Sequence, residues 1–141
     1  RHGAYHACRA LRPGATGVVT DVCVPMSHLP AAVAAAAADI AGAGLIGPIV
    51  GHVGDGNFHA QILVEPGNAT ELAEAKRIAT RMAERALRVG GTITGEHGVG
   101  IGKRGLMAAE HGEGWQVMGA IKTALDPRDI LNPGKLVPDR N

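Results

Sequence analysis

The sequence of 141 residues has few aromatic residues and no excess of charge of either sign. It contains one Trp, one Tyr and one Phe, so its core must be built from Ala, Val, Leu and Ile. A formal net charge of +1 and the lack of a Lys/Arg run give no electrostatic basis for a nucleic-acid partner. Charged residues make up 19% of the chain and hydrophobic residues 45%, which excludes a solvated, disordered chain. We therefore expect one globular domain.

Cysteine and long hydrophobic runs are also scarce. Cys8 and Cys23 are too few for a disulfide framework and lack zinc-type spacing, so both are expected to be thiols. The most apolar stretch, 31–50, contains Asp39 and Pro48, which argue against a membrane span. No signal peptide is visible. We expect a cytoplasmic location. For a longer parent protein, peripheral contact with the inner membrane stays an alternative.

Glycine, in contrast, is abundant, with 21 of 141 residues, roughly twice the usual share of about 7%. Ten glycines fall in two windows, four in 47–59 and six in 90–102. We expect tight backbone conformations in these windows rather than general flexibility.

The order of the predicted elements is β-α-β-β-α-β, which indicates an α+β fold with a ferredoxin-like sheet of strand order 4-1-3-2. Strands are expected over 17–25, 45–53, 58–65 and 92–95. Helices are expected over 2–11, 27–43 and 68–89, with additional C-terminal helices over 105–110 and 114–125. Ser27 and Asn68 are the predicted N-caps of the two central helices. The charged face of the helix over 68–89 is expected to be solvated.

Two histidines flank the predicted turn at 54–57. If these four residues form the hairpin loop, His52 pairs with His59, and their Cβ atoms lie about 4.5–5.5 Å apart on one face of the sheet. Two imidazoles at that separation can share one metal ion. Glu96, which follows the fourth strand at the same end of the sheet, offers a third ligand. Two His and one carboxylate with open positions are a common divalent-metal site.

Two further side chains are candidates for roles beside this site. His97, adjacent to Glu96, is expected to face away from the metal and to act as a general acid or base near neutral pH. Asp55 in the turn is a candidate hydrogen-bond partner for one histidine. The ligand types fit Zn or Mn equally well, and each histidine taken singly is also compatible with an ordinary structural role.

Three segments together resemble one family. They are GHVGDGNFH (51–59), GTITGEHGVGIGKR (91–104) and LDPRDILNPGKLVP (125–138). Their order is similar to that of the C-terminal domain of FAD-linked oxidases, of the FAD-binding oxidoreductase/transferase type 4 family. The first residues, RHGAYHACRALRPG, and TDVCVPMSHLP resemble the D-lactate dehydrogenase (cytochrome) branch. This resemblance covers 1–138.

The resemblance implies that 1–141 is the C-terminal substrate- and metal-binding domain of a longer protein. A start at Arg1 within an expected helix fits such a fragment, whose N-terminal FAD-binding domain would lie elsewhere. In the family pattern, His97 corresponds to the base that takes the hydroxyl proton, and Arg1 to an arginine that binds the substrate carboxylate. Asn132 falls in a tail segment near the flavin. The implied metal ligands are His52, His59 and Glu96.

The implied reaction is oxidation of a D-2-hydroxy acid with hydride transfer to FAD. Electrons would then pass to cytochrome c, a quinone or an electron-transfer flavoprotein. Relatives that act on 2-hydroxyglutarate carry a lysine at about Val19, so its absence favours a monocarboxylate such as D-lactate. Three alternatives stay open: a glycolate oxidase subunit, a D-2-hydroxyglutarate dehydrogenase, and, from another class, a stand-alone metal-binding module without catalysis.

Overall fold

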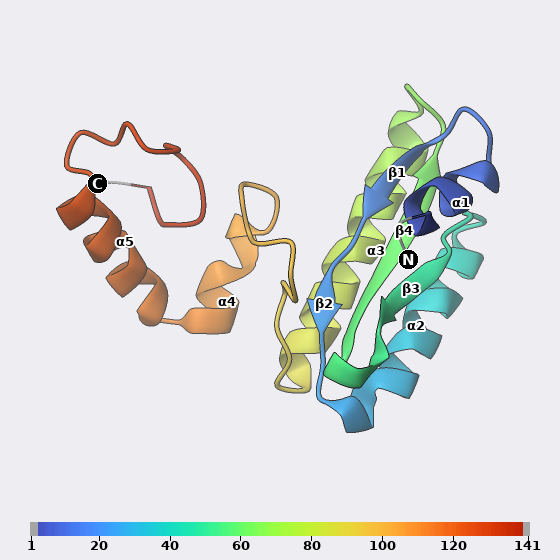
Figure 1. The fold of residues 1–141 in the computed structure, drawn as a ribbon, viewed down its shortest axis with the longest axis horizontal. Coiled ribbons are helices and arrows are strands. Elements are labelled where there is room, and N and C mark those ends of the chain that lie inside the picture. The colour runs from blue at the N-terminus through green and yellow to red at the C-terminus, as the bar shows by residue number, and fades with distance from the viewer. Residues whose placement is uncertain (1–2, 140–141) are drawn as a thin grey trace. The chain divides into compact units, whose positions relative to one another are not determined.

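The computed structural model describes residues 3–139, which form two compact units. The first unit ends at Glu96 and contains the sheet with its main helices, and the second begins at His97 and contains shorter helices (Figure 1). Each unit is described by itself below.

The first unit is built around a central strand in an antiparallel sheet. The strands are β1 (Thr16–Val19), β2 (Val22–Cys23), β3 (Ile49–His52) and β4 (Asn57–Val64). Every residue of β4 is buried, with β3 paired along one of its edges and β1 and β2 along the other. An isolated bridge joins Thr92 to Cys23 beyond β2. These pairings reproduce the predicted strand order 4-1-3-2 and confirm the α+β class.

Three of the predicted strands are shorter than expected. The strand over 45–53 is reduced to β3, with an isolated bridge at Ile46. The strand over 17–25 is interrupted at Thr20, because the Thr20 hydroxyl, rather than its carbonyl, accepts the hydrogen bond of the Ala60 amide at 2.8 Å. The strand over 92–95 is reduced to the Thr92 bridge. Beyond this bridge, Thr94 and Glu96 donate to the side chain of Asp21 instead of continuing a backbone ladder.

Helices α2 (Leu29–Gly42) and α3 (Ala69–Arg88) pack against each other and against β4 (Figure 1). Asn68 caps α3 as predicted, because its Oδ1 accepts from the Glu71 amide at 3.0 Å. The Ser27 cap is wrong, because Met26–His28 forms a 3-10 turn and α2 begins after it. A shorter helix, α1 (Ala4–Ala10), precedes the sheet.

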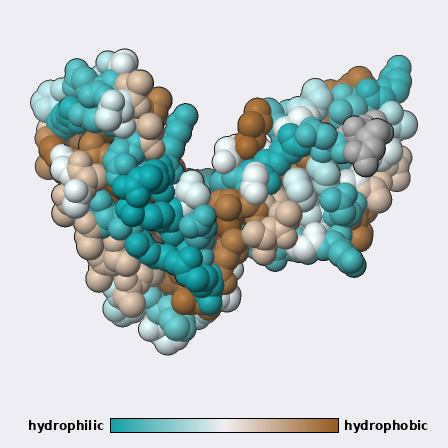
Figure 2. Space-filling model, turned by 180° about the vertical axis from the view of Figure 1, so that it is seen from behind, coloured by the Kyte–Doolittle hydropathy of each residue, from teal (hydrophilic) through white to brown (hydrophobic). Residues whose placement is uncertain are grey.

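The charged face of α3 is only partly solvated. Lys76, Arg77 and Arg88 are exposed, and this surface is the hydrophilic stripe that follows α3 in Figure 2. Arg81 and Arg85, in contrast, form ion pairs with Asp39 of α2. The prediction of a purely solvated face therefore missed an electrostatic contact between two packed helices.

The second unit contains α4 (Met107–His111) and α5 (Gly114–Leu125), which confirms the two predicted C-terminal helices. The tail folds back on α5, because the Trp115 indole donates to the Leu136 carbonyl at 2.8 Å. Asp126 organises the turn that follows α5. Its carboxylate pairs with Lys122 and accepts from the amides of Ile130 and Leu131 at 3.1 and 2.8 Å.

From the contacts of Asp126 we expect that acid loosens this turn and that the change is confined to the second unit. The Lys122 ammonium, followed by the two backbone amides, lowers the pKa of Asp126 from 3.8 to about 2. A carboxyl with a lowered pKa stabilises the fold above its unfolded pKa, and this stabilisation is lost as the pH falls through about 4 toward 2. We expect Asp126→Asn to loosen the turn at neutral pH and to remove much of the change between pH 4 and pH 2.

Fluorescence of Trp115, the single Trp of the chain, measures this directly. The matched control is Glu113→Gln, which changes an exposed carboxylate of the same unit. An acid profile for Asp126→Asn that matches those of the control and the unmodified chain would contradict this role.

Candidate metal centre

The three predicted ligands, His52, His59 and Glu96, come together in the first unit. The Glu96 Oε1 atom lies 2.9 Å from His59 Nε2 and 3.3 Å from His52 Nε2. Two ligand atoms bound to a tetrahedral Zn²⁺ at 2.0–2.1 Å are about 3.3 Å apart, so these separations match those of atoms that share one cation. Side-chain exposure is 9% for His59, 29% for His52 and 45% for Glu96, so one side of the cluster is open to solvent.

The two histidines meet through a different strand register from the predicted one. His52 pairs with Asn57, and His59 pairs with Val50, so the predicted pairing of His52 with His59 is wrong. The loop spans 53–56 because Gly56 turns the chain with φ +73°. Since the shift is two residues, both side chains stay on the same face of the sheet. Their ring centroids lie 6.0 Å apart.

Gly56 cannot be replaced without moving the neighbouring strand. Besides its positive φ, a Cβ atom at this position would lie 2.0 Å from the Val24 carbonyl oxygen. The hairpin loop can therefore approach the segment after β2 only with glycine there, as the glycine-rich window over 47–59 predicted.

The tautomer of His59 is set by the Thr20 carbonyl. His59 Nδ1 lies 3.1 Å from this oxygen, which can only accept, so Nδ1 is the donor. The Thr20 carbonyl is available to His59 because the Ala60 amide donates to the Thr20 hydroxyl instead. When His59 is neutral, its Nε2 lone pair faces Glu96 Oε1 at 2.9 Å. Two acceptors at that distance need a positive charge between them, either a proton or a metal ion, so the cluster fits a cation.

Sequence reasoning missed Asp21, the buried carboxylate beneath this cluster. Asp21 is 1% exposed, and its oxygens accept from Asn57 Nδ2 at 2.8 Å and from the Glu96 amide at 3.1 Å. A signal was present, because Asp21 is the one charged residue in an otherwise apolar strand over 17–25, where a buried charge requires partners. Asp55, the predicted partner, is exposed, and Asp21 lies next to His59 in its place.

Gly95 allows the chain to reach Asp21. A Cβ atom at Gly95 would lie 1.7 Å from Asn57 Nδ2 and 3.0 Å from Asp21 Oδ1. A side chain there would displace the buried amide and carboxylate that fix the next residue, Glu96.

The family model of the FAD linked oxidases, C-terminal domain, matches residues 1–136. The chain belongs to this family. It is 47% identical to the probable mitochondrial D-lactate dehydrogenase of Danio rerio, over 97% of the chain and 28% of that protein. It is 44% identical to the mitochondrial D-lactate dehydrogenase [cytochrome] of Arabidopsis thaliana, over 98% of the chain and 24% of that protein.

A third relative is the glycolate oxidase subunit GlcD of Bacillus subtilis, at 39% identity over 96% of the chain and 29% of that protein. The chain thus spans 24–29% of the length of these relatives. Among the helices formed by residues 3–139, none has the length and apolar character needed to cross a membrane.

Three more site residues were predicted for this FAD-linked oxidase domain, namely Arg1, His97 and Asn132. Arg1 lies outside the described residues. His97 is the first residue of the second unit. Asn132 is in the tail of that unit, where it adopts φ +50° and its Oδ1 lies 3.4 Å from Lys135 Nζ. The structure therefore brings together the metal-ligand set and leaves the roles of these three residues as predictions.

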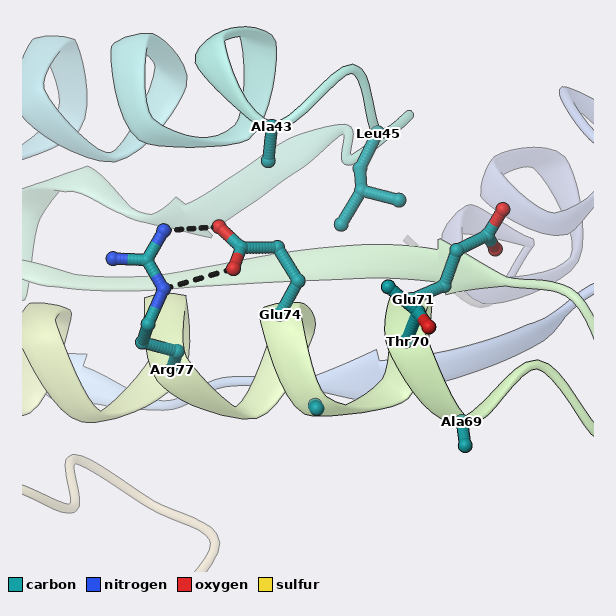
Figure 3. A pocket seen from close by; sticks show the side chains of 8 residues that line it. Ala43, Leu45, Ala69, Thr70, Glu71, Glu74 and Arg77 are labelled. Atoms are coloured by element: carbon teal, nitrogen blue, oxygen red, sulfur yellow. Dashed lines mark hydrogen bonds and ion pairs between the residues drawn. The ribbon is translucent and has the colours of Figure 1, made fainter.

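A separate groove of about 570 Å³ lies between the end of α2 and the start of α3 (Figure 3). Figure 3 shows Glu74 and Arg77 paired with each other on its wall, opposite Ala43 and Leu45. None of the predicted site residues lines this groove, and its charged side chains are already paired, Glu74 with Arg77 and Glu71 with Arg12.

The close approach at Gly95 predicts that Gly95→Ala destabilises the first unit. Forcing a methyl group into the contact with Asn57 should lower the free energy of unfolding by about 1–3 kcal/mol, the usual cost of overpacking. Urea denaturation measures this loss. Gly102→Ala is the control, because a Cβ atom there meets nothing within 4 Å. Equal stability of the two variants would show that the approach at Gly95 is not tight.

Proposed function

We propose that residues 1–141 are the substrate- and metal-binding domain of an FAD-dependent D-2-hydroxy-acid dehydrogenase that oxidises D-lactate to pyruvate. The FAD would be bound mainly by an N-terminal domain of the same protein. The observation that carries the proposal is the cluster of His52, His59 and Glu96, whose facing acceptor atoms are spaced as ligands of one cation are. The higher identity to proteins named D-lactate dehydrogenase, 47% and 44%, than to the GlcD subunit, 39%, supports lactate.

The ligand set supports a divalent ion, Zn or Mn. When bound, such an ion supplies a positive charge that orients the hydroxyl and carboxylate oxygens of a 2-hydroxy acid and favours loss of the hydroxyl proton. His59 would contribute Nε2, because Nδ1 is held by the Thr20 carbonyl. The exposed side of the cluster leaves positions for substrate oxygens.

The remaining residues would bind the substrate and move its proton. His97 would take the hydroxyl proton, since a neutral imidazole is a suitable base near neutral pH. Arg1 would hold the carboxylate through its guanidinium fork. Asn132 would lie near the flavin, where hydride acceptance is the chemistry that the cofactor supplies.

Val19 supports a small, uncharged substituent on the substrate. It pairs with Gln61 on β4, two residues from His59, so alternation places Val19 on the face that carries the metal ligands. Its side chain is 43% exposed. An apolar residue at this place suits the methyl group of lactate better than a second carboxylate. Glycolate stays the second candidate because of the GlcD relative.

The electron acceptor, whether cytochrome c, a quinone or an electron-transfer flavoprotein, stays a prediction. So does the location in the cytoplasm with peripheral contact at the inner membrane.

The first test of the proposal is metal content. We expect the chain to retain about one divalent ion per molecule after exposure to Zn²⁺ or Mn²⁺ and gel filtration, and His52→Ala to lose it because one of three ligands is gone. Elemental analysis measures the ratio. His28→Ala, which changes an exposed histidine of the same unit, is the control and should keep the ion. Retention of stoichiometric metal by His52→Ala would refute the ligand set.

The second test is turnover by a protein that carries this chain together with its FAD-binding domain. With an artificial electron acceptor, we expect D-lactate to be oxidised faster than glycolate or D-2-hydroxyglutarate. His97→Ala should lower kcat by about 10²–10⁴-fold, the usual contribution of a general base, while flavin absorbance is unchanged. Normal turnover by His97→Ala would exclude it as the base.

A further inference from the structure

Asp21 is a charged residue inside the sheet, directly beside a metal-ligand candidate. The pairings of Val19 with Gln61 and of Val22 with Phe58 continue one register, which places Asp21 opposite His59. The two side chains therefore lie on the same face, with Asp21 Oδ1 at 3.5 Å from His59 Nδ1. The Asp21 side chain has no exposed surface, so water cannot solvate its charge.

Protein donors from two separate segments take the place of water. Asp21 Oδ1 accepts from Asn57 Nδ2, at the start of β4, at 2.8 Å. Asp21 Oδ2 accepts from Thr94 Oγ1 at 3.0 Å and from the Glu96 amide at 3.1 Å. One carboxylate thus ties the backbone of Glu96 to the strands that carry the two histidines.

This tie matters because Glu96 lies beyond the last bridge of its segment to the sheet. Within residues 3–139, the β-bridge that joins this segment to the sheet is Thr92–Cys23, four residues earlier. A ligand on an unanchored segment must be ordered when a cation binds, and that ordering weakens binding. The Asp21 carboxylate removes this cost in advance, since it fixes the amide of the ligand residue itself.

We propose that Asp21 is a positioning residue, which holds Glu96 in place for a divalent cation through hydrogen bonds to the Glu96 amide and the Thr94 hydroxyl. This inference rests on the proposed function, because it assumes the ligand set given there. Asp21 acts through Glu96 and is not itself assigned as a ligand.

Isothermal titration of the chain with Zn²⁺ tests the proposal, using Asp21→Asn. The amide keeps the size of the side chain but has a single acceptor oxygen in place of a carboxylate that accepts from three groups. We expect the Zn²⁺ dissociation constant to rise by about 10–100-fold, the usual effect of losing a partner of a ligand. Circular dichroism checks that the variant is folded.

Two further variants separate positioning from a general loss of stability. Asp39→Asn removes another largely buried carboxylate, which pairs with Arg81 and Arg85 away from the cluster, and should change the dissociation constant less than about threefold. If Asp21→Asn does not fold, Thr94→Val removes one bond to Asp21 with little change of shape. That variant should bind Zn²⁺ roughly three- to tenfold more weakly.

A double-variant cycle tests whether Asp21 works through Glu96. On a Glu96→Gln background, where the two imidazoles still bind Zn²⁺, Asp21→Asn should weaken binding by less than about threefold. The full effect on that background would overturn the proposal, as would unchanged affinity of folded Asp21→Asn or Thr94→Val. Absence of binding by the unmodified chain would overturn the ligand set as well, so the two failures are distinguishable.

Discussion

The constraint on which the first unit depends is the burial of one carboxylate, Asp21. A buried charge without partners costs several kcal/mol, so the chain must bring donors to it. Those donors are Asn57 at the start of β4 and the segment that contains Thr94 and Glu96. The burial of Asp21 also explains why the expected fourth strand stops after Thr92. The Thr94 hydroxyl and the Glu96 amide donate to the Asp21 carboxylate, and the segment does not continue a backbone ladder.

The backbone around the proposed metal ligands is consistent with this burial of Asp21. At Thr20 the hydroxyl completes the strand, so the carbonyl becomes available to fix the tautomer of His59. Gly95 brings Glu96 down to Asp21, and Gly56 brings the hairpin loop against the segment after β2. Five of the ten glycines in the two glycine-rich windows, among them Gly56 and Gly95, lie in such tight contacts, and a Cβ atom at the other five would meet nothing within 4 Å. In a family of FAD-linked oxidases, this gives the proposed metal a preformed set of ligands with one open side.

The order of elements could be read from the sequence because it depends on local periodicity and caps. The Asn68 cap, the length of α3 and the sheet order are confirmed for that reason. The register of the hairpin was wrong by two residues, because it depends on where Gly56 turns. The two histidines still share a face, because side-chain direction in a strand repeats every two residues.

Contacts between distant residues could not be predicted in the same way. Asp21 acquires its role from Asn57 and Glu96, 36 and 75 residues away along the chain, and no local pattern records such distances. The contacts of Arg81 and Arg85 with Asp39 were missed for the same reason. The three ligands could be predicted because a short hairpin brings two of them together, while the roles of Arg1, His97 and Asn132 stay predictions.

The central claim is that two imidazoles and one carboxylate of the first unit bind a single cation. X-ray absorption at the zinc edge of the Zn²⁺-loaded chain measures those ligands directly. We predict two imidazole nitrogens at about 2.0–2.1 Å, together with carboxylate or water oxygens at about 2.0–2.2 Å. A sulfur ligand at about 2.3 Å, or a shell of oxygens without imidazole, would contradict it.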